Sequence, residues 1–219
     1  MGNLFSLDNG FFSFLSKVCD IIFLSIIFVI FCIPVITIGP ACTALYYATV
    51  KVIRRERGYV FREFFRSFKL NFKKGAIVGI LLTIVYIIVG FDLWAAYRAL
   101  DGSTLRFAMF GVYLAIAILA LGFSVYVYPV LSRFDVSLRQ LIKTVLIISL
   151  RHLPSTVCMI ILTGAAVLGV YIIPFLLFVI PGVLVLLNSL LMEKILKKYT
   201  PQPEGGSEDE SKKDEWYLE

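Results

Sequence analysis

The sequence predicts an all-α membrane protein: a polytopic helical bundle of about five transmembrane helices, with two basic amphipathic helices on its cytoplasmic side. Of its 219 residues, 59% are apolar and the mean hydropathy is +0.89, which leaves too few polar side chains to cover a water-soluble globule. Several charge-free runs are long enough to cross the roughly 30 Å hydrocarbon core of a bilayer. Basic residues gather in the connections between those runs.

The charge-free runs set the expected spans. The longest run, Leu153–Met192, has 40 residues and would measure about 60 Å as one helix, so it must fold back on itself. Its glycines and prolines place the turn near Val170–Pro174. The expected spans, within one membrane domain at residues 1–199, are residues 18–38, 75–97, 106–131, 153–171 and 174–195. Residues 200–219 have the composition of a disordered acidic tail.

The basic connections predict the orientation in the membrane. Lys51–Lys74 carries nine bases against two acids, and Arg133–Arg151 carries four bases against one acid. Five spans with the N-terminus outside place both segments in the cytoplasm, together with the C-terminus. We therefore expect a multi-pass protein of the cell membrane whose lipid partner is a bilayer with an anionic inner leaflet. Because the bases flank apolar spans, no nucleic-acid partner is expected.

The first span is expected to break near its inner end, where two prolines stand six residues apart. A second short helix at residues 41–57 then becomes basic at its end. Broken helices hold polar ligands in transporters, and tyrosines suit sugar stacking; a structural hinge is the other interpretation. The candidate ligand or hinge residues are Pro34, Thr37, Gly39, Pro40, Thr43, Tyr46 and Tyr47.

Two basic connections predict amphipathic helices. In "VFREFFRSFKLNFKK", which begins at Val60, phenylalanines recur on one helical face and cations lie largely off it, as suits a helix in the membrane interface. The segment after Arg133 repeats the theme, with Asp135 or Ser137 as the expected helix cap. The alternative to lipid contact is docking of a partner protein. The residues of this candidate surface are Arg54, Arg55, Arg57, Phe61, Phe64, Phe65, Phe68, Arg133 and Arg139.

Other polar and small residues in the spans have structural interpretations. Gly75 and Gly79 predict a close helix contact. Glu193, at a span end, is expected to be solvated or to pair with Lys197. Asn188, deeper in that span, is expected to bond another helix, with a substrate contact as the alternative. The sequence contains no phosphate-binding glycine loop, Ser/His/Asp set or metal-ligand cluster, so no enzyme activity, cofactor or metal is expected.

Two segments resemble a known family. "IPVITIGPACTALYYATVKVIRRERGYVFREFFRSFKLNFKKG" resembles the proline–threonine–glycine–proline signature and phenylalanine-rich arm of the YesL-like bacterial membrane proteins, and "YPVLSRFDVSLRQLIKTVLIISLRHLP" resembles their second characteristic segment. The family has no known function, and its members occur in Gram-positive bacteria, often beside genes for carbohydrate uptake. The resemblance implies an accessory role in carbohydrate uptake or sensing, and with no enzyme motif in the chain we expect a non-enzymatic accessory or regulatory component. The alternative, which the Pro34–Pro40 break beside Tyr46 and Tyr47 suggests, is a small oligomeric transporter or binding protein for a carbohydrate. Candidate partners are a sugar transporter or sensor complex and a second copy of the chain.

Overall fold

The chain is all-α, as the sequence predicts. The computed structural model describes residues 10–98 and 104–199, and within these stretches every regular element is a helix. The α-helices are α1 Gly10–Phe31, α2 Ile38–Ala48, α3 Val60–Leu70, α4 Phe72–Arg98, α5 Thr104–Arg133, α6 Leu138–Arg151, α7 Leu153–Ile172 and α8 Ile180–Leu196. Short 3-10 or π segments are Val35–Thr37, Thr49–Arg54, Pro174–Phe178 and Lys197–Tyr199. The predicted acidic tail at 200–219 lies outside the described residues.

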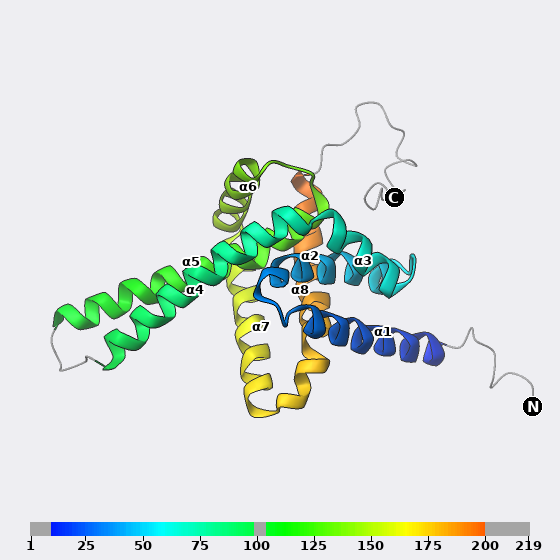
Figure 1. Cartoon of the computed structure of the whole chain (residues 1–219), viewed down its shortest axis with the longest axis horizontal. Coiled ribbons are helices and arrows are strands. Elements are labelled where there is room, and N and C mark those ends of the chain that lie inside the picture. Colours follow the sequence, from blue (N-terminus) through cyan, green and yellow to red (C-terminus); the bar gives the residue numbers. More distant parts are fainter. Residues whose placement is uncertain (1–9, 99–103, 200–219) are drawn as a thin grey trace, which may run out of the picture.

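Three arms radiate from a central region (Figure 1). The arms are α1, the α4–α5 hairpin and the α7–α8 hairpin, and we call the region where they meet the hub; it comprises residues 35–74, 129–153 and 188–199. The helix α1 ends at the hub, α4 and α7 begin there, and α5 and α8 end there. The basic connections therefore gather at the hub, as the predicted topology requires. Which face of the membrane the hub occupies stays a prediction.

Five helices in the described part of the chain are long and apolar enough to cross a membrane, which is characteristic of a multi-pass membrane protein. They are Ser13–Phe31, Val35–Arg54, Phe72–Arg98, Phe107–Arg133 and Leu153–Ile172. The number agrees with the prediction, but the set differs. The expected last span begins later than predicted, because Pro174–Phe178 forms a 3-10 turn and α8, of 17 residues, starts at Ile180 with Pro181 in its first turn.

Among the five long apolar helices, Val35–Arg54, which contains α2, takes the place of the expected span 174–195. The first span ends at Phe31 rather than at residue 38, and the Thr37 hydroxyl donates to the carbonyls of Phe31 and Pro34 (2.6 and 2.7 Å) in the connection. In the apolar stretch that contains α2, 78% is buried inside the protein, against 6% in the apolar stretch of α5. We conclude that α2 forms the centre of the hub and is largely shielded from lipid.

Close contact between α2 and α4 depends on three glycines. A Cβ atom added at Gly39 would lie 1.9 Å from the carbonyl oxygen of Gly75, and one added at Gly79 would lie 2.8 Å from the Gly39 nitrogen. The two backbones can approach this closely only without side chains. The predicted close contact of Gly75 and Gly79 is confirmed, and α2 is the partner helix.

The two amphipathic helices both pack on protein. On α3, Phe64 is fully buried and Phe68 nearly so, and the ring of Phe31 lies 5.8 and 5.0 Å from theirs, centroid to centroid. This corrects the expectation that these two rings face lipid or a partner: they cover α2 and the end of α1. On α6, Ser137 forms a capping box with Gln140, which agrees with one of the two expected caps.

Candidate functional site

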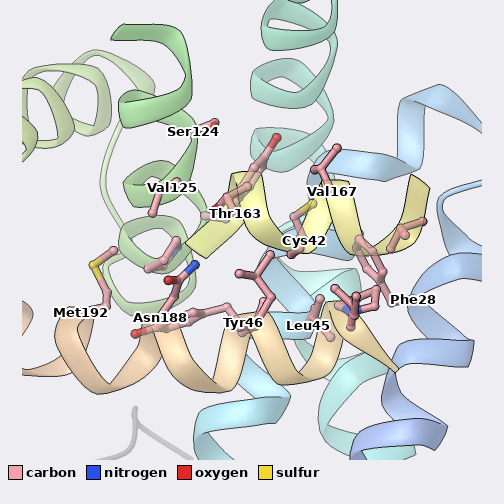
Figure 2. Close-up of a pocket in the computed structure, with 18 of the residues that line it drawn as sticks. Phe28, Cys42, Leu45, Tyr46, Ser124, Val125, Thr163, Val167, Asn188 and Met192 are labelled. Carbon is pink, nitrogen blue, oxygen red and sulfur yellow. The ribbon is translucent and has the colours of Figure 1, made fainter. Parts of the chain in front are cut away.

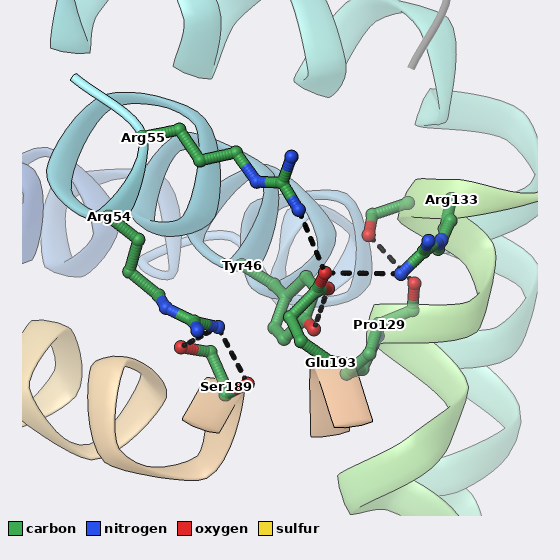
Figure 3. Close-up of polar contacts among 8 residues, drawn as sticks. Tyr46, Arg54, Arg55, Pro129, Arg133, Ser189 and Glu193 are labelled. Atoms are coloured by element: carbon green, nitrogen blue, oxygen red, sulfur yellow. Dashed lines mark hydrogen bonds and ion pairs between the residues drawn. The ribbon is translucent and has the colours of Figure 1, made fainter. Parts of the chain in front are cut away.

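Glu193 is the centre of a buried ion network in the hub (Figure 3). Its side chain comes from the last turn of α8, and the residue is only 4% exposed. Oε1 accepts a hydrogen bond from the Tyr46 hydroxyl at 2.9 Å, and Oε2 lies 3.1 Å from Arg133 Nη1 and 3.5 Å from Arg55 Nη2. One carboxylate therefore joins α2 and the residues that follow it to the hub ends of α5 and α8.

A second contact reinforces the joint between α2 and α8. The guanidinium of Arg54 donates from Nη1 to the Ser189 carbonyl oxygen at 2.8 Å (Figure 3). A buried carboxylate and its guanidinium partners each lose hydration, so the arrangement is favourable only while all of them are present. We infer that this network sets the position of the α7–α8 arm relative to the α5 arm.

A second ion pair fastens α3 to α2. Lys51 Nζ lies 3.0 Å from Glu63 Oε2 and donates to the Tyr47 hydroxyl at 3.2 Å, and the Lys51 and Glu63 side chains are both less than a tenth exposed. Lys51 lies in the π-helical segment Thr49–Arg54, which continues α2. Wider π turns shift side chains around the helix axis and occur often at functional sites. In this protein the segment carries both Lys51 and Arg54.

A cavity of about 400 Å³ lies next to the Glu193 network. Residues of α1, α2, α5, α7, α8 and the turn Pro174–Phe178 line it, and almost all of the lining is apolar. Figure 2 shows Asn188 and Met192 of α8 together with Tyr46 among the lining residues. Tyr46 connects the two features, because its ring lines the cavity while its hydroxyl donates to Glu193.

The network and the cavity are suited to holding helices together and to binding an apolar molecule. In residues 10–98 and 104–199 no group of three or more His, Cys, Asp or Glu side chains is placed to hold a metal ion. The acidic group at the centre, Glu193, is already occupied by Tyr46 and two guanidinium groups.

The expected ligand or hinge residues are placed in different environments. Pro34 and Thr37 form the connection from α1 to α2, Gly39 and Pro40 pack on α4, and the Thr43 hydroxyl donates to the Gly39 carbonyl. Tyr47 faces Lys51. Of these seven residues, Tyr46 alone lines the cavity.

The expected surface residues divide into two groups. Phe64, Phe68 and Arg133 are buried, so they belong to the hub's interior and not to its surface. Arg54 and Arg55 bind α8. The exposed members are Arg54, Arg57, Phe61 and Arg139, with Phe65 half-buried.

Sequence reasoning missed the role of Glu193 and Arg133. Glu193 directly follows the charge-free run Leu153–Met192, and Arg133 directly follows the run Phe107–Ser132. Both residues end expected spans on the same side of the membrane and carry opposite charges, so the sequence could have suggested that Glu193 and Arg133 pair. The sequence-based expectation assigned Glu193 to solvent or to Lys197.

Comparison with known proteins yields a partial family match. A family described as "Protein of unknown function, DUF624" matches residues 21–93, from α1 through most of α4. No curated protein and no solved structure matches the chain. The matched part contains the three close-packed glycines, Tyr46 and the Lys51–Glu63 pair, but not Arg133 or Glu193.

Proposed function

We propose that the protein is a non-enzymatic accessory or regulatory membrane protein that binds another membrane protein, or a second copy of itself, through its arms. The supporting observation is that the arms diverge from the hub and leave membrane-length helices with little protein around them (Figure 1). Only 6% of the apolar stretch of α5, and 11% of the apolar stretch of α7, is buried inside the chain. Lipid or the helices of another protein must cover the remainder.

Small residues on α5 favour a helical partner over lipid alone. Gly111 and Ala115 are both exposed and stand one turn apart, and a Cβ added at Gly111 would meet no atom of the described chain within 4 Å. Small residues at this spacing allow two helices to approach closely in a bilayer. A sugar transporter or sensor complex is the partner that the family resemblance suggests.

The alternative function, a small carbohydrate transporter, receives less support from the cavity. A sugar needs many hydrogen-bonding groups around it, whereas this cavity is lined almost entirely by apolar groups and contains no charged side chain in the described part of the chain. Thr37 and Tyr47, two of the residues expected to contact a sugar, do not line it.

Affinity capture of the full chain from mildly solubilised membranes, followed by native mass spectrometry, tests the proposal. We expect a second copy or a distinct membrane protein to be recovered with it. The double variant Gly111→Ile/Ala115→Ile should lose that partner, while the control Val112→Leu/Ile116→Leu on the same helix should retain it. Recovery of the chain alone, under conditions that preserve other membrane complexes, would overturn the proposal.

A further inference from the structure

The cavity beside α7 and α8 is long and follows one face of each helix. Besides Pro181 and Val185, the α8 wall includes Ile180, Leu184, Asn188 and Met192. These residues recur every fourth position, so the wall extends for about 18 Å at 1.5 Å per residue. Opposite them, α7 contributes Thr163, Val167 and Val170, which also share a helical face. The α8 lining is therefore long enough to run beside one extended chain.

The chemistry of the cavity is that of an uncharged ligand with one polar group. No charged side chain lines it in the described part of the molecule. The hydroxyls of Ser124 and Thr163 donate to the carbonyls of Leu121 and Met159 within their own helices. The Asn188 Oδ1 atom is buried and has no hydrogen-bond partner among the described residues. A buried amide oxygen of this kind is normally satisfied, so this atom calls for a donor.

Polarity changes along the cavity in the direction expected of a bound lipid. Asn188 precedes Ser189, whose carbonyl binds Arg54, so the amide lies at the hub end. The opposite end is made by apolar residues near the tip of the arm, including Leu177. Leu177 and Val167 line the cavity yet are 39% and 64% exposed, so the opening is bordered by apolar side chains. In a membrane such an opening faces hydrocarbon.

We infer that this cavity binds a neutral membrane lipid that carries a free hydroxyl group, namely a diacylglycerol. One acyl chain lies between α7 and α8, and the hydroxyl donates to Asn188 Oδ1. A charged headgroup is excluded from the cavity, because burial of a charge without a counter-charge is costly. The site does not depend on the proposed accessory function: the lipid can bind whether or not a protein partner covers the arms.

Photolabelling of the full chain in phosphatidylcholine nanodiscs tests the site. The probe is a diacylglycerol with a diazirine on one acyl chain, and we expect its adducts on the cavity-lining parts of α5, α7 and α8. Ala166→Phe, which fills the cavity, should reduce this labelling at least fivefold. Ile161→Phe is the matched control, because Ile161 lies on α7 outside the lining and is 64% exposed; it should label like the wild type.

A comparison of competitors tests the hydroxyl contact without altering the fold. Unlabelled diacylglycerol should compete about fivefold better than its methyl ether, because the ether cannot donate to Asn188. Phosphatidylglycerol should compete least. In Asn188→Leu the alcohol and the ether should become equal. Equal competition by all three lipids in the wild type, or adducts spread evenly over the outer faces of the arms, would overturn the inference.

Discussion

The hub and the arms of this protein are stabilised in opposite ways. In the hub, backbones touch at glycines and buried charges are paired across four elements. In the arms, helices of membrane length expose apolar side chains along much of their length (Figure 1). Contacts between arms are few: the Gly182 N–H donates to Ser25 Oγ at 2.9 Å, and the hydroxyls of Tyr126 and Thr156 lie 3.0 Å apart. Specific polar pairing fixes geometry, whereas apolar surface in a bilayer is nearly indifferent to what covers it. The hub therefore determines the shape, and the arms remain available to lipid or to another protein.

We expect the largest loss of stability when the charge at the centre of the hub is removed. Glu193→Ala leaves the cations of Arg133 and Arg55 without their carboxylate, and we expect a loss of about 3–5 kcal/mol in unfolding free energy, measured by denaturation in mixed micelles. The double variant Glu193→Leu/Arg133→Met should be less damaging than Glu193→Ala. Glu56→Ala removes only the solvent-exposed Lys17–Glu56 pair and serves as the control. If both alanine variants had equal effects, the network would not be a structural centre.

The next largest effect is expected at the contact between α2 and α4. Gly39→Ala places a methyl group 1.9 Å from the Gly75 carbonyl oxygen, so the two helices must separate. We expect the unfolding free energy to fall by at least about 1–3 kcal/mol. Gly90→Ala is the matched change in an arm, where the added methyl group has open space around it. Thermal unfolding should show a lower midpoint for Gly39→Ala and no lowering of the midpoint for Gly90→Ala. A tolerated Gly39→Ala would contradict the close packing of the hub.

A smaller effect is expected at the start of α6. Ser137→Ala removes the half of the capping box in which Ser137 Oγ accepts from the Gln140 N–H, and should cost about 1 kcal/mol. Ser16→Ala, at an exposed position within α1, should cost nothing. Parallel unfolding titrations of the two variants measure the difference.

The smallest effect is the pH dependence of a surface ion pair. The Lys74 ammonium, 2.5 Å from the carboxylate, lowers the pKa of Asp135 below its ordinary value. Because the pKa of Asp135 is lower in the folded state, its ionised form stabilises the fold at pH values above the unfolded pKa of about 3.9. This stabilisation is lost as the pH falls through the pKa of the folded state. Asp135→Asn should therefore remove a small part of the stability change between pH 5 and pH 3, as measured by unfolding midpoints. An unchanged pH profile in the variant would show that the pair contributes nothing.

The sequence predicted what depends on local patterns. Charge-free runs gave the helical membrane class, the turn near Pro174 followed from its breakers, and Ser137 and the pair Gly75 and Gly79 were recognised from short motifs. The partners of Glu193 depend on residues 60 and 147 positions away, which no periodicity encodes. The phenylalanine face of α3 showed that something apolar covers it, but protein and lipid satisfy that pattern equally well.

The separation of the two hairpin arms can be measured as a distance between spin labels. With the four native cysteines replaced, labels at Met109 on α5 and Tyr171 on α7, both exposed, report the separation of the two hairpin arms in nanodiscs. We expect a distance far above the roughly 8–10 Å between the axes of packed neighbouring helices. A distribution centred near that packed spacing would show a closed bundle and would rule out diverging arms.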